Sequence, residues 1–94
     1  MADAGQVLIL AVQSAGWAGA VMILLAYLLL SAHKLTGRSL LYQGMNVFGA
    51  AGIALNSWWF GALPSATLNV VWAGIGAIAS WRILKKRRSS TSAM

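Results

Sequence analysis

The chain alternates long apolar segments with short polar ones. The first apolar segment covers residues 7–30, and the longer stretch 39–81 contains no Asp, Glu, Lys, Arg or His. As one helix, the second stretch would reach about 64 Å, roughly twice the hydrocarbon core of a bilayer, so it suits two crossings. Gly61, Pro64 and Ser65 supply the break, because Gly favours a helix end and Pro a first turn. The pattern therefore predicts helices at about residues 7–31, 40–60 and 64–84, followed by a basic tail at 85–94.

The composition places these helices in a membrane. Hydrophobic residues make up 60% of the chain and charged residues only 9%, whereas about a quarter of the residues of a soluble domain are charged. A signal peptide has a basic start and an apolar core of about 7–15 residues. The first segment is longer and follows Asp3. We expect an all-α integral membrane protein, a single domain with three transmembrane helices.

The positions of the basic residues predict an orientation. Lys34 and Arg38 lie between the first two apolar segments, and a basic cluster ends the third segment. Basic residues accumulate on the cytoplasmic side of membrane proteins, so we expect the N-terminus outside and the C-terminus in the cytoplasm. The net charge of +6 is thus interpreted as a topology and lipid anchor, with membrane lipids and not nucleic acid as partners. The anchor residues are Arg82, Lys85, Lys86, Arg87 and Arg88.

The residue types exclude several kinds of chemistry. The chain has no Cys, one His (His33) and one acid (Asp3), which leaves almost no ligands for a metal site. No carboxylate or nucleophile accompanies His33, and phosphate-binding loops and zinc spacings are absent. We expect no enzyme activity, no catalytic residues, no metal and no cofactor.

Each predicted helix has one face of polar and small residues. Such faces serve helix packing, in which amides hydrogen-bond across the contact and Asn56 could pair with Asn69. Alternatively they line a hydrated path, to which amides offer donors and acceptors. No acid or base lies within the membrane core of the predicted helices, so a transported solute would be neutral and its movement facilitative. The candidate residues for a path or interhelical contact are Gln13, Tyr27, Asn46, Asn56, Asn69 and Trp72.

Short motifs resemble those of the SemiSWEET half-transporters of the PQ-loop superfamily. The motifs are the loop KLTGRS at 34–39, the turn GALP at 61–64, and Asn69. The patterns Leu41-Tyr42-Gln43…Asn46…Gly49-Ala50 and Leu68-Asn69-Val70-Val71-Trp72 are closer still to short, uncharacterised bacterial proteins labelled permease. The resemblance implies a three-helix bundle that forms homodimers in the bacterial inner membrane, with Asn69 in the position of a substrate-binding Asn.

The chain departs from that pattern at three places. The Pro-Gln hinge of the superfamily corresponds to Ala26-Tyr27, the pocket Trp to Ile53, and a gating Tyr to Asn56. Half of the sugar site and the hinge are therefore missing. Two functions follow as expectations. The first is a homodimeric facilitative permease for a small neutral solute, and the alternative is a structural or accessory subunit packed within a larger membrane complex.

Overall fold

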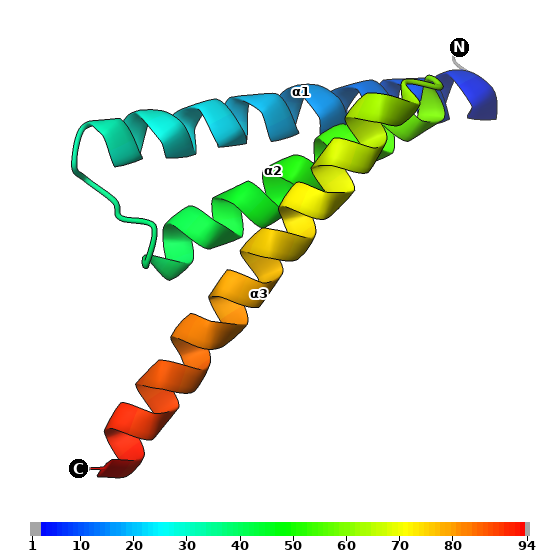
Figure 1. Cartoon of the computed structure of the whole chain (residues 1–94). Helices are drawn as coiled ribbons and strands as arrows, with labels where there is room; N and C mark the ends of the chain where they lie inside the picture. The colour runs from blue at the N-terminus through cyan, green and yellow to red at the C-terminus, as the bar shows by residue number, and fades with distance from the viewer. Residues whose placement is uncertain (1–2, 94) are drawn as a thin grey trace.

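The computed structural model describes residues 3–93, with side chains for residues 3–88. Three helices follow one another: α1 (Ala4–Ser31), α2 (Leu40–Trp59) and α3 (Leu63–Ala93) (Figure 1). The prediction of an all-helical chain with three helices is confirmed. Residues 1–2 and 94, which belong to the expected N-terminal segment and basic tail, lie outside the described residues.

A capping box begins α1 three residues before the predicted start. The Asp3 carboxylate accepts the backbone N–H of Gln6 at 2.8 Å, and the Gln6 side-chain oxygen accepts the N–H of Asp3 at 3.1 Å. This reciprocal arrangement satisfies two backbone donors that a helix start leaves unpaired. The single acid of the chain is therefore a helix cap.

The turn between α2 and α3 lies where the sequence predicts it. Gly61 adopts a φ of 77°, and the N–H of Ala62 donates to the carbonyl of Ser57 at 2.7 Å. Helix α2 is therefore followed by a residue in the left-handed conformation, which Gly adopts at little energetic cost. Pro64 then occupies the first turn of α3, where its missing N–H leaves no bond unmade.

The connection between α1 and α2 is tied at both ends. His33 adopts a φ of 61°, and the N–H of Lys34 donates to the carbonyl of Leu29 at 2.8 Å, so α1 also ends in a left-handed residue. At the other end, the side-chain amide of Gln43 donates to the carbonyl of Gly37 at 2.7 Å. The loop that carries Arg38 is therefore fastened to the first turn of α2.

Helix α2 lies between the other two helices. Both α1 and α3 pack on α2, and among the described residues α1 and α3 make no contact with each other. The helices converge at the α2–α3 turn near the start of α1 and diverge toward the opposite end, where α3 swings away (Figure 1). The expectation that three polar faces share one interior is therefore not met within a single chain. Helix α2 has instead one contact face toward each neighbour.

Helix α3 continues well beyond its predicted end at residue 84. It runs through the basic residues to Ala93 as a single helix. Lys and Arg are good helix formers, and cations near a helix C-terminus interact favourably with its dipole. Within this extension the Lys85 ammonium lies over the ring of Trp81, 5.1 Å from its centroid. The basic segment thus extends the helix instead of forming a separate tail.

Apolar side chains cover the outside of the molecule. The buried apolar residues are all of modest size, namely Val12, Ala26, Ala50, Ala54 and Ala66, and no described side chain of large volume is fully buried. Large apolar side chains are exposed instead, Trp17 to 73% and Phe48 to 72%. In water this surface would be unfavourable by the hydrophobic effect, which rewards removal of apolar area from water. The chain has the surface of a protein solvated by lipid.

Two helices are long and apolar enough to cross a membrane. They are α1 over Ala4–Ser31 and α3 over Leu63–Arg88, in which a membrane-length window of 18 residues has a mean hydropathy of 2.0 and 1.3, respectively. Helix α2 has sufficient length, but its amide and hydroxyl side chains keep its hydropathy below the value expected of a span. The structure supports membrane association of two helices, and a third crossing stays a prediction.

Candidate functional site: a polar pocket between α2 and α3

Glycines bring α1 and α2 into backbone contact. A Cβ added at Gly19 would collide with the carbonyl oxygen of Gly49, and one at Gly52 would lie 2.5 Å from the carbonyl oxygen of Ala15. Real Cβ atoms are not found so close, so only glycine permits this crossing. Small residues at such positions are typical of membrane helices that pack by direct backbone approach.

Asn56 belongs to this crossing. Its side-chain amide donates to the carbonyl of Val12 on α1 at 3.1 Å. A cavity of about 340 Å³ opens beside it, with Trp17 on its wall; the lining residues are Gly16, Trp17, Ala20, Ile53 and Asn56. Asn56 forms no hydrogen bond with Asn69 among the described residues, so the pairing across the hairpin that the sequence left open does not form. It acts as an interhelical contact between α1 and α2.

Asn69 makes its contacts within the α2–α3 turn. Its amide donates to the backbone carbonyl of Ser65 at 2.9 Å, one helical turn earlier. The hydroxyl of Ser65 in turn lies 2.8 Å from that of Ser57, which links α3 to α2. Asn69 therefore supports the residue that fastens the hairpin.

Asn46 is the buried amide without a protein partner. It is 5% exposed, and among the described residues nothing forms a hydrogen bond with its side chain. No fully inaccessible side-chain nitrogen or oxygen in the described part of the chain lacks a partner, so the amide atoms of Asn46 must reach open space. That space is a cavity of about 180 Å³ between α2 and α3, lined by Tyr42, Gln43, Asn46, Trp72, Ile75 and Gly76.

Two features shape this cavity, called here the Asn46 pocket. Gly76 lets α3 approach α2 closely beside the cavity, because a Cβ there would lie 2.9 Å from Cγ2 of Val47. Trp72 and Tyr42 contribute ring surface, and Asn46 contributes one donor group and one acceptor. Such a pocket suits a small neutral molecule with polar and apolar sides. Among the described residues, no Asp, Glu, His, Lys or Arg lines it.

The structure thus separates the candidate residues into different places. Asn46 and Trp72 line one pocket between α2 and α3, whereas Asn56 lines another between α1 and α2 together with Trp17. Trp17 and Trp72 therefore line different pockets. On α1, Tyr27 is 62% exposed and Gln13 is also exposed, so the two line neither pocket.

Gln43 and Gly76 are pocket residues that the candidate set lacks. A signal for Gln43 exists, because it lies three residues before Asn46 and so on the same side of a helix. Gly76 could only be found once the partner of α3 was known.

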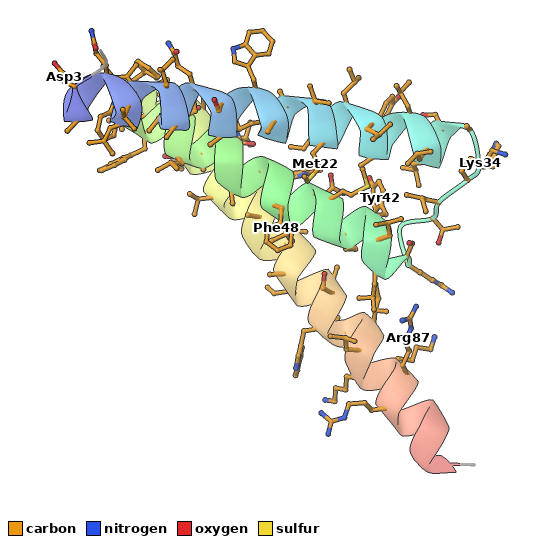
Figure 2. All side chains as sticks on the ribbon, turned by 180° about the vertical axis from the view of Figure 1, so that it is seen from behind. Asp3, Met22, Lys34, Tyr42, Phe48 and Arg87 are labelled. Carbon is orange, nitrogen blue, oxygen red and sulfur yellow. The ribbon has the colours of Figure 1, made fainter. Side chains whose placement is uncertain are left out.

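The charged residues lie apart from both pockets. Among the described residues no three His, Cys, Asp or Glu side chains come together as a metal site would require. Asp3 lies at one end of the molecule and the basic Lys34 and Arg87 at the other (Figure 2). Of the predicted anchor residues, Arg82, Lys86 and Arg87 line a further cavity together with Arg38.

Fold and surface together define a small all-helical protein with two helices able to span a membrane. A protein-family model matches residues 12–88 of the chain, and the chain belongs to that family, whose function is uncharacterised. The match covers all three helices and gives no link to the SemiSWEET proteins. Neither the curated proteins nor the solved structures contain a match.

Proposed function

We propose that the chain is an integral membrane protein of the bacterial inner membrane and forms a homodimeric facilitative permease for a small neutral solute. The observation that carries this proposal is the Asn46 pocket, where a buried amide faces open space instead of a protein partner. Its donor and acceptor form no hydrogen bond with the described residues and remain available to a molecule in the pocket. A polar group placed in this way is better explained by a ligand than by packing.

Membrane insertion is supported by the surface and the charge distribution. Apolar side chains face outward on all three helices, and the basic residues lie at the end opposite Asp3. By the positive-inside rule, the loop before α2 and the end of α3 would be cytoplasmic. This gives three crossings with the N-terminus outside, provided that α2 inserts together with its neighbours.

A second copy is required for a continuous path. The Asn46 pocket is small, and α1 does not reach α3 to close it. A partner chain placed against the open side between α1 and α3 would cover the exposed ring of Trp72 and enclose the polar residues. Tyr27 and Gln13, exposed on α1, would then be available to a path formed by two chains.

One observation favours the accessory subunit instead. The surface carries large exposed aromatic residues, including Phe48 on α2. Such a surface fits a docking face on a larger membrane complex as well as it fits a second copy. Under this alternative, the Asn46 amide would receive its hydrogen bonds from the neighbouring subunit.

Solute flux through vesicles that contain the purified chain tests the permease. The probes are urea, glycerol, erythritol and a monosaccharide, and the readout is light scattering after an osmotic step. We expect flux of at least one probe above protein-free vesicles and a loss of about tenfold or more in Asn46→Leu, which removes a hydrogen-bonding group worth about 1.4 kcal/mol or more. Gly74→Ala is the control, because a Cβ there meets open space.

The mass of the particle extracted gently from native membranes separates the two proposals. A dimer of this chain, with flux that depends on Asn46, supports the permease. A single copy held in a larger assembly, with no flux of any probe from the purified chain, would contradict the permease and favour the accessory subunit.

A further inference from the structure

A basic cavity joins the α1–α2 loop to the extension of α3. It has a volume of about 430 Å³ and is lined by Arg38, Arg82, Ile83, Lys86 and Arg87. Arg38 comes from the loop, whereas the others come from consecutive turns of α3. Residues four apart lie on one side of a helix, which places Arg82 and Lys86 together. Arg87 lies on the side of α3 that faces the beginning of α2 (Figure 2).

The loop holds Arg38 in place through the backbone on both sides. The carbonyl of Gly37 accepts the Gln43 amide at 2.7 Å, and the N–H of Ser39 donates to the carbonyl of Thr36 at 3.0 Å. Ser39 also caps α2, its hydroxyl accepting the N–H of Tyr42 at 3.4 Å. Arg38 is thus positioned by α2 itself.

No acidic side chain lies beside Arg38, Arg82 and Lys86 in the described part of the chain. The single acid of the sequence, Asp3, caps α1 at the far end of the molecule. The like charges of Arg38, Arg82 and Lys86 around one cavity repel each other, and an anion between them converts repulsion into attraction. Basic residues that serve only as a topology signal could lie anywhere near the membrane surface. Such residues would not have to line the same cavity.

We propose that this cavity binds a phosphate group, with Arg38, Arg82 and Lys86 as its ligands. The planar guanidinium groups match phosphate oxygens in paired hydrogen bonds, and Lys adds a point charge. The phosphate can belong to an anionic phospholipid or to a soluble ion. Ile83 provides an apolar wall beside the cations, suited to the glycerol and upper acyl chain of a lipid. The site is independent of the Asn46 pocket.

Matched charge removals test the site on the full chain in micelles. The pocket variant is Arg82→Gln with Lys86→Gln, and the control is Lys85→Gln with Arg88→Gln, which removes the same charge from the same helix but outside the cavity. Binding of phosphatidylglycerol and phosphatidylcholine is titrated by native mass spectrometry at fixed salt. For each substituted residue, we expect the affinity of the pocket variant for phosphatidylglycerol to fall about fivefold. The affinity of the control variant for the same lipid should fall less than about twofold.

A second pair isolates the loop. Arg38→Gln should weaken phosphatidylglycerol binding, whereas Lys34→Gln, in the same loop but outside the cavity, should not. In the background of the pocket variant, Arg38→Gln should reduce the affinity for phosphatidylglycerol by a smaller factor. The reason is that substitutions of residues that bind the same ligand do not have additive effects. These side chains are exposed, so helicity by circular dichroism should be unchanged.

Competition with inorganic phosphate identifies the source of the group. Displacement of the lipid by millimolar phosphate assigns the cavity to a soluble phosphate, and retention assigns it to a lipid headgroup; either result supports a phosphate site. Equal losses in the pocket and control variants would overturn the proposal. Such equal losses would show that only diffuse attraction of the basic segment to anionic lipid remains.

Discussion

Asn46 and Asn56 lie on the same helix and differ in what their amides contact. Asn56 donates to Val12 and so joins α2 to α1. Asn46 has no such bond and faces the Asn46 pocket. The same residue type therefore serves packing at one position and supplies a candidate binding group at the other. From the sequence alone, both positions could be interpreted either as interhelical contacts or as residues that line a hydrated path.

Replacement of each asparagine by leucine should affect stability in opposite directions. Asn46→Leu replaces an amide that forms no protein hydrogen bond with an apolar side chain, so we expect unfolding in mixed micelles to become less favourable by up to about 1 kcal/mol. Asn56→Leu removes a bond across the helices and should lower stability by about 0.5–2 kcal/mol. Circular dichroism during titration with a denaturing detergent measures both. Destabilisation by Asn46→Leu of the size seen for Asn56→Leu would make Asn46 a packing residue.

At the scale of helices, the contact between α1 and α2 depends on the absence of side chains. Gly19 and Gly52 each face a backbone carbonyl of the other helix. Backbone cannot move aside as a flexible side chain can, so any added atom must separate the helices. The contact of α2 with α3 is different, since there a hydroxyl pair and the side chain of Val47 meet the partner helix.

We therefore expect Gly19→Ala to open the α1–α2 crossing. The added methyl group meets Gly49, and overpacking of this kind costs about 1–3 kcal/mol. Spin labels on cysteines introduced at Ala18 and Ala51 would show a longer and broader distance. Gly44→Ala is the matched control, because a Cβ there meets nothing. An unchanged distance in Gly19→Ala would show that α1 and α2 do not cross at this point.

The helices themselves were largely predictable, and their packing was not. Charge-free length and the Gly61–Pro64 break locate α2 and the turn because they depend on local chemistry. The capping box at Asp3 and Gln6 is also a local signal, and it gives the true start of α1. The extension of α3 has no apolar pattern, so a prediction based on hydropathy ended it at residue 84.

Pairing of side chains across helices depends on which faces meet, and spacing along the chain does not determine that. Asn56 and Asn69 lie at similar distances from the turn, yet Asn56 points to α1 while Asn69 bonds within α3. The order of packing, with α2 in the middle, decides this outcome. That order emerges from the Gly-mediated crossing and is not visible in any single helix.

For the whole molecule, the orientation in the membrane is directly testable because the chain has no cysteine. A single Cys at Ala62 in the α2–α3 turn should react with a membrane-impermeant maleimide in intact cells. A single Cys at Thr36 in the basic loop should react only after permeabilisation, since basic loops remain cytoplasmic. The reverse labelling would invert the topology, and labelling of both sites from outside would show that α2 does not cross.

The central place of α2 has a consequence for the order of events during synthesis. Unlike α1 and α3, helix α2 has no membrane-length window apolar enough for a span, and its polar groups find partners on both sides, Asn56 on α1 and Ser57 on α3. Helix α1 is complete when α2 emerges from the ribosome, but α3 is not, and its synthesis takes on the order of seconds. During that interval one polar side of α2 lacks its partner. The proposed topology with three crossings therefore favours entry of α2 and α3 together as a hairpin, with the Gly61 turn leading.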